Sequence, residues 1–164
     1  MGYLSLLVVA TLLAVGAYAC QPPDCDHPDC GSCANACCSI DFMFEKGPDD
    51  VFNTLMDSLK KGGADGRYKF VNSTDYRKDN ISVQYQLQGI HSTLVHHYND
   101  TLDFLVEKAD TKAVLKAFSI SRIEGAYCDA GQNYKNLVGL VKGLDLMFEQ
   151  KKMYGCSGKP EKTG

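Results

Sequence analysis

Apolar side chains recur at helical spacing in two segments of the chain. After Pro48 and two acidic residues, the first segment carries an apolar stripe, namely Val51, Phe52, Leu55, Met56 and Leu59. This spacing predicts a short amphipathic helix. Lys60, Lys61 and the two glycines after them are typical of a helix C-terminus, because cations favour its negative end and glycine adopts the left-handed cap. The second segment, residues 131–151, predicts a longer helix through Leu137, Leu140, Val141, Leu144, Met147 and Phe148.

Between these segments, apolar and polar residues alternate, which indicates antiparallel strands with one buried face. The alternation is clearest over residues 81–88, where an apolar residue stands at every odd position. Further strands are expected at 68–71, 93–98, 102–106 and 112–123, with turns at Asn99-Asp100 and at Ala109-Asp110-Thr111. The sequence therefore predicts an α+β fold, in which a curled antiparallel sheet of about five strands is flanked by two helices and braced by disulfides.

Residues 1–19 differ in composition from the rest of the chain, because they contain no charged side chain. The apolar run from Leu4 to Val15 has the length of a signal-peptide core and is shorter than the roughly 20 residues of a membrane span. Small residues at Ala17 and Ala19 predict cleavage after Ala19. We therefore expect a secreted protein, or one of the secretory-pathway lumen, without a stable membrane span. An uncleaved anchor and a lipoprotein are the alternatives.

The rest of the chain divides by composition into three parts. We expect a cysteine-rich ribbon at residues 20–47, a single α+β domain at 48–154 and a flexible tail at 155–164. Three N-glycosylation sequons agree with export, and their acceptors are Asn72, Asn80 and Asn99.

Eight cysteines, an even number in an exported chain, indicate a disulfide framework. They are Cys20, Cys25, Cys30, Cys33, Cys37, Cys38, Cys128 and Cys156. Cys128 and Cys156 flank the second predicted helix, whose 21 residues would span roughly 32 Å, so we expect no bond between them. Each would instead reach back to the ribbon, where the adjacent Cys37 and Cys38 are candidates for these long-range bonds. The alternative is a zinc or copper site, suggested by the CxxC at Cys30 and Cys33 and by the nearby His27.

The net charge argues against one class of function and indicates no other. The 17 basic and 20 acidic residues give a formal charge of −3, which argues against a nucleic-acid-binding protein. The hydrophobic and charged fractions, 45% and 23%, are those of an ordinary globular domain.

Several segments resemble domain-of-unknown-function family 1499. They are the first predicted helix at 49–59, the segment 97–104, and residues 119–133, which join the last predicted strand to the last helix. The family pattern in the third segment is Ser-Arg, then Gly-Tyr-Ser-Asp, then Gly and Asn, and it is matched by Arg122, Asp129, Gly131 and Asn133. The resemblance covers about residues 48–150 and implies an α+β fold. It implies no activity, because the family has no established biochemical function.

The Arg122–Asn133 segment has a structural and a functional interpretation. In the first, Asp129 caps the last helix and Arg122 pairs with Asp129, Asp100 or Asp103. In the second, Arg122, Asp129 and Asn133 bind the polar head of a ligand beside the helix N-terminus, and a pocket under the sheet holds its apolar tail.

Histidines give a competing hypothesis. His91 and His97 would share one face of a regular strand near Asp100, and such a set could bind a metal ion or perform acid–base chemistry. Solvated histidines on a strand are the simpler interpretation.

We therefore favour a secreted, disulfide-stabilised, glycosylated and non-enzymatic protein, whose ligand is lipid-like or another small amphiphile. The sequence indicates no cofactor and sets no oligomeric state. One alternative is a metal-dependent or hydrolytic extracellular enzyme that uses residues 91–103. Another is an extracellular matrix or structural interaction protein.

Overall fold

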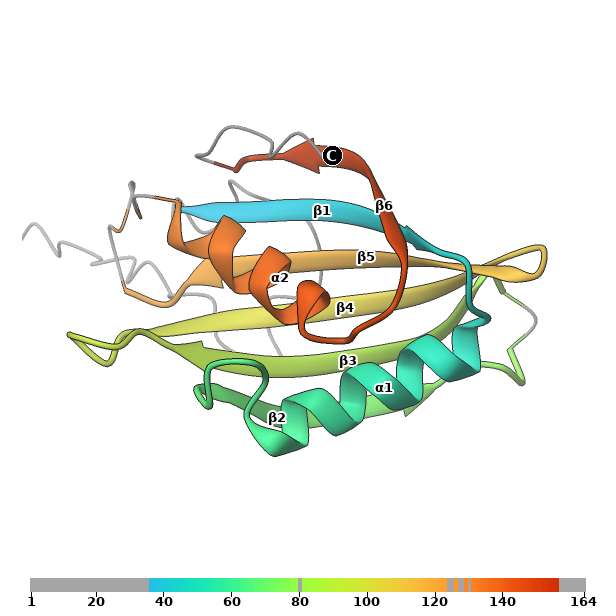
Figure 1. The fold of residues 1–164 in the computed structure, drawn as a ribbon, viewed down its shortest axis with the longest axis horizontal. Coiled ribbons are helices and arrows are strands. Elements are labelled where there is room, and N and C mark those ends of the chain that lie inside the picture. The colour runs from blue at the N-terminus through green and yellow to red at the C-terminus, as the bar shows by residue number, and fades with distance from the viewer. Residues whose placement is uncertain (1–35, 80, 124–125, 127–128, 130, 157–164) are drawn as a thin grey trace, which may run out of the picture.

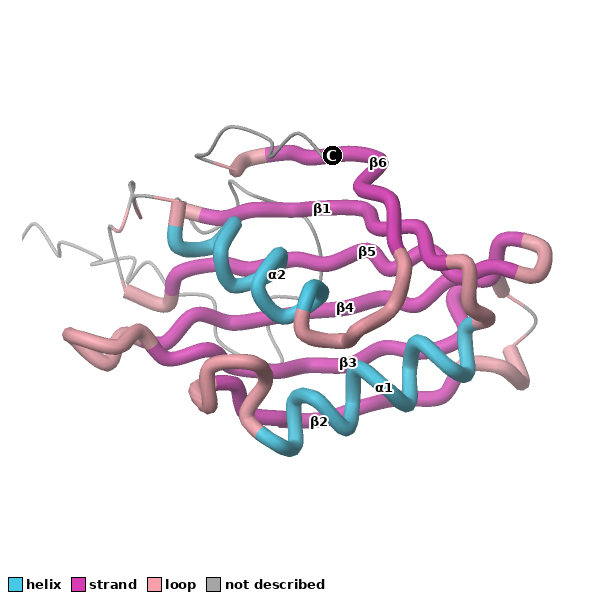
Figure 2. The backbone as a smooth tube through the Cα atoms, viewed as in Figure 1, coloured by secondary structure: helices cyan, strands magenta, loops and turns pink. Residues whose placement is uncertain are grey.

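The fold is known from a computed structural model that describes residues 36–156, apart from 80, 124–125, 127–128 and 130. The elements are β1 (Cys37–Phe44), α1 (Pro48–Lys61), β2 (Tyr68–Asp75), β3 (Val83–Ser92), β4 (Asn99–Ala109), β5 (Lys112–Ser121), α2 (Gln132–Lys142) and β6 (Phe148–Tyr154) (Figure 1). The six strands form one antiparallel sheet in the order β2-β3-β4-β5-β1-β6. Both helices lie on the same face of this sheet (Figures 1 and 2). The α+β class is confirmed, and the sheet is larger than the five strands expected.

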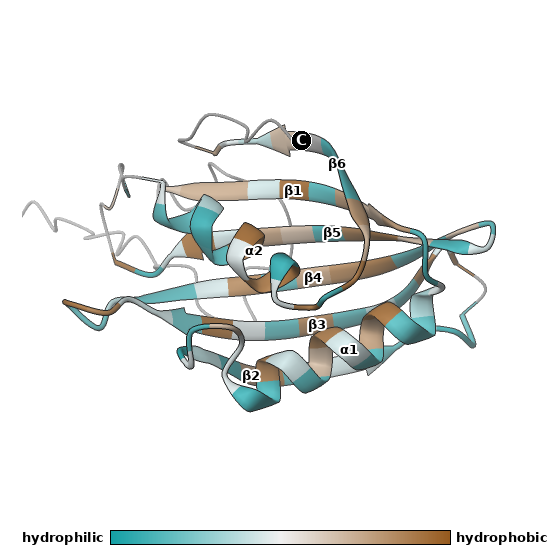
Figure 3. Ribbon diagram, in the orientation of Figure 1, coloured by the Kyte–Doolittle hydropathy of each residue, from teal (hydrophilic) through white to brown (hydrophobic). Residues whose placement is uncertain are grey.

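The first helix agrees with its prediction. Pro48 stands in its first turn, and the chain leaves it at Gly62, whose φ of 95° is left-handed. Val51, Leu55 and Leu59 are fully buried against the sheet, so the expected apolar stripe is the inner face of α1. Figure 3 shows hydrophobic and hydrophilic residues alternating along the ribbon of α1.

The strand β1 lies within residues 20–47, which were predicted to form a cysteine-rich ribbon. It pairs with β5 on one side and β6 on the other, inside the sheet. Ile40, Phe42 and Phe44 are fully buried on the helix side and alternate with less buried residues. The partners of this strand are some 70 and 110 residues away in sequence, and local pattern does not reveal such pairing.

The second helix is shorter than predicted. It ends at Lys142 instead of continuing to residue 151, and the chain turns at Asp145, whose φ is 54°. It then forms β6, in which the Phe148 ring packs 5.5 Å from Phe42 and 6.0 Å from Phe44, measured between ring centroids. Met147, expected on the buried stripe, is 78% exposed. The helical spacing of the last apolar residues therefore does not correspond to a helix, because Phe148 lies in a strand and packs against the phenylalanines of β1.

Residues 93–98 form the loop between β3 and β4 and not the expected third strand. Asn99 and Asp100, expected in a turn, are the first residues of β4. The turn at Ala109-Asp110-Thr111 is confirmed, with Asp110 at a φ of 55°. The apolar side chains of Leu94 and Val95 suggested a strand, but in the fold they have no layer to pack against in the sheet core.

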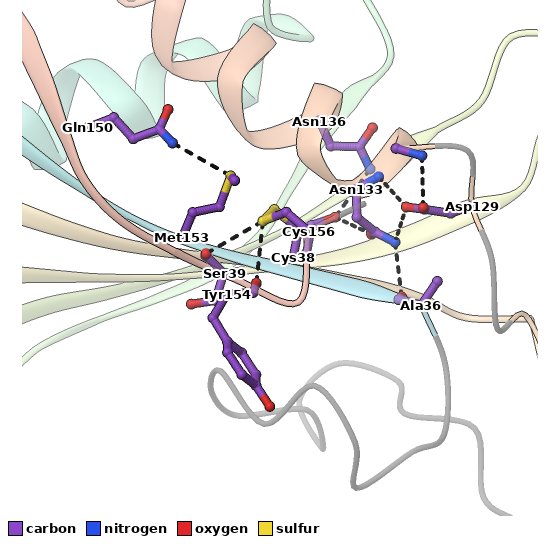
Figure 4. The surroundings of a disulfide bond; sticks show 12 residues. Ala36, Cys38, Ser39, Asp129, Asn133, Asn136, Gln150, Met153, Tyr154 and Cys156 are labelled. Carbon is purple, nitrogen blue, oxygen red and sulfur yellow. Dashed lines mark hydrogen bonds between the residues drawn. A yellow bond between two sulfur atoms is a disulfide. The ribbon is translucent and has the colours of Figure 1, made fainter. Parts of the chain in front are cut away.

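One disulfide joins Cys38 in β1 to Cys156, just beyond β6 (Figure 4). Because Cys156 bonds Cys38, the expectation that it does not bond Cys128 is confirmed. The reason differs from the predicted long helix: β6 runs beside β1 and brings the two cysteines together. Cys37 is disulfide-bonded as well, and the other five cysteines lie outside the described residues, as do the predicted signal peptide and nearly all of the tail.

Two of the three predicted glycosylation acceptors can be placed. Asn72 in β2 and Asn99 at the start of β4 are exposed, whereas Asn80 lies outside the described residues. Within the described part of the chain, no helix has both the length and the apolar character needed to cross a membrane.

Candidate functional site

A pocket of about 620 Å³ lies at one end of the sheet. The β3–β4 loop, at the left of Figure 1, meets there three described residues between β5 and α2, namely Ile123, Ala126 and Asp129. The residues lining it are Arg67, Thr93, Leu94, Val95, His96, Tyr98, Asp100, Ser121, Ile123, Ala126, Asp129 and Gln132. Its volume is in the range of small-molecule binding sites.

One wall of the pocket is apolar. Leu94, Val95 and Tyr98 come from the β3–β4 loop, and Ile123 comes from the segment after β5. Their exposed fractions are 68%, 75%, 48% and 39%, so four large apolar side chains are in contact with water at one place. The loop tip is the hydrophobic projection at the left of Figure 3. Clustered apolar exposure of this kind marks binding surfaces more often than single exposed residues do.

The floor of the pocket is polar and is centred on Asp100. This residue is the second of β4, points to the helix side of the sheet and is only 3% exposed. The Asn136 side-chain amide donates a hydrogen bond of 2.7 Å to its Oδ2 atom, and the Ser121 hydroxyl also hydrogen-bonds it.

Burial raises the pKa of Asp100, because a low-dielectric site disfavours the carboxylate. The negative charge of Asp129 raises this pKa further, whereas the hydrogen bonds from Asn136 and Ser121 and the nearby His91 act to lower it. The net direction is upward, so this carboxyl is charged less readily than an exposed one. A ligand that compensates its charge would remove this penalty.

Buried hydrogen bonds hold α2 against the sheet beside the pocket. Asn133 lies at the start of the helix, where its side-chain amide donates to the Ala36 carbonyl at 2.9 Å and to the Ser121 hydroxyl at 3.1 Å. The Ser119 hydroxyl donates to Asn133 at 2.6 Å, and it accepts from the Asn136 amide at 3.2 Å. Figure 4 shows Asn133 and Asn136 directed from α2 toward the strands. These bonds fix the positions of the groups around Asp100.

The N-cap residue of α2 is Gly131, and the Asp129 carboxylate bonds the helix start from two residues upstream, in agreement with the structural interpretation. This carboxylate accepts hydrogen bonds from the backbone N–H groups of Gly131 at 2.9 Å and Asn133 at 2.6 Å. Gly131 has a φ of 77°, a left-handed conformation that favours glycine. The carboxylate of Asp129 thus satisfies helix-terminal donors while also lining the pocket.

Arg67 and His91 share a carboxylate partner next to the pocket. The Arg67 guanidinium lies 2.7 Å from the Oδ2 atom of Asp65. His91 Nε2 lies 3.0 Å from the same oxygen atom. His91 is almost fully buried in β3, pairs across the strands with Asp100, and packs its ring 4.5 Å from that of Tyr68. Arg67 therefore already has a carboxylate partner, which it shares with His91, whereas its buried Nε atom has no hydrogen-bond partner among the described residues.

The structure brings some of the predicted site residues together and separates others. Asp129 and Asp100 line the pocket, and Asn133 supports it from α2. Arg122 is half-buried and is not among the lining residues; its backbone N–H donates to the Asn99 carbonyl at 3.2 Å.

The proposed histidine pair does not share a face. β3 ends at Ser92, so the even spacing of a regular strand does not extend from His91 to His97, which is exposed in the loop at a φ of 52°. Among the described residues, no cluster of three or more metal-ligating side chains is present.

Several pocket residues were not identified from the sequence. Ser121 and Gln132 come from β5 and α2, Arg67 precedes β2, and most of the apolar wall comes from a loop that the pattern predicted to be a strand. Asn136 does not line the pocket, but it hydrogen-bonds Asp100 from α2. Asn133 and Asn136 carried a usable signal, because they stand on the same helix face as Leu137 and Leu140. Polar amides on an apolar face indicate buried hydrogen bonds.

No protein-family model, curated protein or solved structure matches this chain.

Proposed function

We propose that this chain is a binding protein for a small amphiphilic ligand, which it holds in the pocket at the end of the sheet. The observation that carries the proposal is the division of this pocket into an apolar wall and a buried polar floor. An amphiphile matches both parts, because its tail removes Leu94, Val95 and Tyr98 from water and its head pairs with the buried polar groups.

Binding without catalysis is favoured because the polar groups of the pocket are already engaged in hydrogen bonds within the protein. Ser121 accepts from Asn133 and bonds Asp100, and the Asp129 carboxylate bonds the start of α2. These groups are fixed as parts of the scaffold, which suits recognition of a ligand head more than nucleophilic attack.

Secretion and glycosylation belong to the same proposal. Disulfides persist in oxidising compartments, and the bond between Cys38 and Cys156 agrees with export. N-terminal sequencing of the natural protein is expected to begin at Cys20; a sequence that begins upstream would contradict the predicted cleavage. The resemblance to domain-of-unknown-function family 1499 adds no activity to this proposal.

A single introduced tryptophan tests the binding function. The chain contains no tryptophan, so Tyr98→Trp places one emitter on the pocket wall. Titration with 1-dodecanol below its solubility limit is expected to shift the emission of this variant to shorter wavelength, with saturation at one equivalent.

Met147→Trp is the matched control, because Met147 is also exposed but lies between α2 and β6 and does not line the pocket. Its emission is expected to stay unchanged. Equal shifts in both variants would indicate non-specific adsorption. No shift in either variant with 1-dodecanol, dodecylamine or dodecanoate would refute the binding function.

A further inference from the structure

We infer that the polar end of the pocket recognises a cationic head group, so that the ligand is a long-chain amine and not a fatty acid. This inference rests on the proposed function and adds the chemical class of the ligand. It is carried by Asp100, a buried carboxyl that lines the pocket and accepts hydrogen bonds from two neutral side chains, those of Asn136 and Ser121.

The hydrogen bonds of Asp100 leave capacity for a ligand. A carboxylate has roughly four acceptor positions, and the amide of Asn136 and the hydroxyl of Ser121 account for two of them. An ammonium group carries three donors and a full positive charge, so it can occupy the remaining positions and balance the charge. An alcohol provides one donor and no charge, and a carboxylate provides no donor and a negative charge.

The charged groups around Asp100 favour the same sign of ligand. From the segment before α2, Asp129 adds a second negative charge to the pocket lining. Arg67 lines the pocket from the β2 side and is paired with Asp65 at 2.7 Å, and His96 lines it from the β3–β4 loop. From β3, His91 contacts the same Asp65. An anionic head would therefore enter a site where two carboxylates face it and the guanidinium already has a partner.

The shape of the pocket gives the ligand an orientation. Asp100 lies at the polar floor, whereas Leu94 and Val95 stand at the exposed loop tip. The ammonium group would enter first and contact Asp100, and the alkyl chain would lie along the loop and Ile123. A single-chain amphiphile of about twelve carbons is compatible with a volume of about 620 Å³.

Three ligands that differ only in the head group test the inference: dodecylamine, 1-dodecanol and dodecanoate. Their affinities are measured at pH 7.5 with the Tyr98→Trp protein, below the micelle-forming concentrations. Dodecylamine is expected to bind about tenfold or more tightly than 1-dodecanol, and dodecanoate more weakly than the alcohol. If all three bind equally, or dodecanoate binds best, the inference is wrong while the proposed binding function stands. If none binds, the proposed function fails and the inference fails with it.

Asp100→Asn in the same reporter protein locates the interaction. This substitution keeps the shape and the acceptor for Asn136 but removes the charge, so the preference for the amine over the alcohol is expected to disappear. Affinity for 1-dodecanol should change less than about threefold. Asp110→Asn is the control, because Asp110 lies in the exposed turn between β4 and β5, and this variant should keep the full preference. An amine preference that survives in Asp100→Asn would overturn the inference.

Two further measurements do not depend on how well the Asp100 variant folds. Gln132→Lys places a cation in the pocket lining, so it is expected to weaken dodecylamine and strengthen dodecanoate. In the Tyr98→Trp protein, the affinity for dodecylamine should fall as pH falls and Asp100 takes up a proton, while that for 1-dodecanol stays nearly constant. An amine affinity independent of both changes would contradict a role for the Asp100 charge.

Discussion

At the residue scale, burial and exposure give two aspartates opposite properties. Asp75 is exposed in β2, and the hydrogen-bonded Arg77 guanidinium lowers its pKa to about 2. Asp100 is buried among neutral donors, and burial raises its pKa above the ordinary value. The same side chain is therefore a stable anion in one place and a costly one in the other, and only the second creates a demand for a cation.

The first prediction concerns the pH dependence of folding. Because the pKa of Asp100 is higher in the folded state than its ordinary 3.8, the folded protein holds more protons than the unfolded protein at pH values between the two. The free energy of unfolding of the wild type should therefore fall with rising pH relative to that of Asp100→Asn, and the difference should level off above the raised pKa. Urea denaturation at a series of pH values from 3.5 to 8 measures this difference. A flat or rising difference would contradict the assignment.

A second prediction compares two glycines in the loop between α1 and β2. Both have left-handed φ angles, 64° at Gly63 and 74° at Gly66. A Cβ atom at Gly63 would lie 2.2 Å from the Tyr68 ring, whereas one at Gly66 has no atom within 4 Å. Gly66→Ala should destabilise the fold by about 1 kcal/mol, the cost of the left-handed conformation.

Gly63→Ala should cost about 1–3 kcal/mol beyond that, because the Tyr68 ring must move and its hydroxyl donates a buried hydrogen bond of 2.7 Å to the Asn136 carbonyl. Urea denaturation midpoints of the two variants give the comparison. Equal losses would mean that the ring moves without cost.

At the scale of elements, helix α1 and the β3–β4 loop use the same residue type for different purposes. Leu55 is fully buried between α1 and the sheet, whereas Leu94 is 68% exposed on the pocket wall. The first position serves stability and the second serves binding. The sequence pattern alone did not separate them, because both leucines stand in apolar runs.

The third prediction separates these roles by one substitution at each position. Leu55→Ala should reduce the free energy of unfolding by about 2–5 kcal/mol, because it opens a cavity in the core. Leu94→Ala should change it by less than about 0.5 kcal/mol while weakening the binding of 1-dodecanol several-fold. Denaturation and the Tyr98→Trp titration measure the two effects. A strong destabilisation by Leu94→Ala would argue that the loop is part of the core.

At the scale of the whole molecule, the two ends of the described chain meet in the sheet. β1 begins at Cys37 and pairs with β6, which ends at Tyr154. The disulfide between Cys38 and Cys156 closes a loop with a sequence separation of 118 residues. Closing so long a loop restricts the unfolded chain strongly, so this bond stabilises the complete domain and not only its edge.

The fourth prediction follows from this bond. Replacing both cysteines, Cys38→Ala with Cys156→Ala, should lower the free energy of unfolding by about 2–4 kcal/mol. The spectroscopic signature of the native sheet should persist, since the core around Phe42 and Leu115 is unaltered. Denaturation without reductant measures the loss. Stability within about 0.5 kcal/mol of the wild type would show that the chain ends are held by β-pairing alone.

Local pattern in the sequence was sufficient for the features that depend on neighbouring residues. It predicted α1 with both its ends, the turn at Asp110, the bonding of Asp129 to the start of α2 and the α+β class. These features depend on helix periodicity, capping and turn chemistry within a few residues of one another. The expectation that Cys156 does not bond Cys128 was correct, although it rested on a helix that is shorter in the structure than predicted.

Features that depend on partners far away in the sequence could not be predicted from local pattern and became visible only in the fold. The pairing of β1 with β5 and β6 turned a supposed ribbon and the end of a supposed helix into two strands. The pocket joins the residue before β2, the loop after β3, the start of β4 and the start of α2, which are separated in the sequence by up to 65 residues, from Arg67 to Gln132. Burial raises the pKa of Asp100 for the same reason, because the layers that exclude water from it are contributed by distant segments.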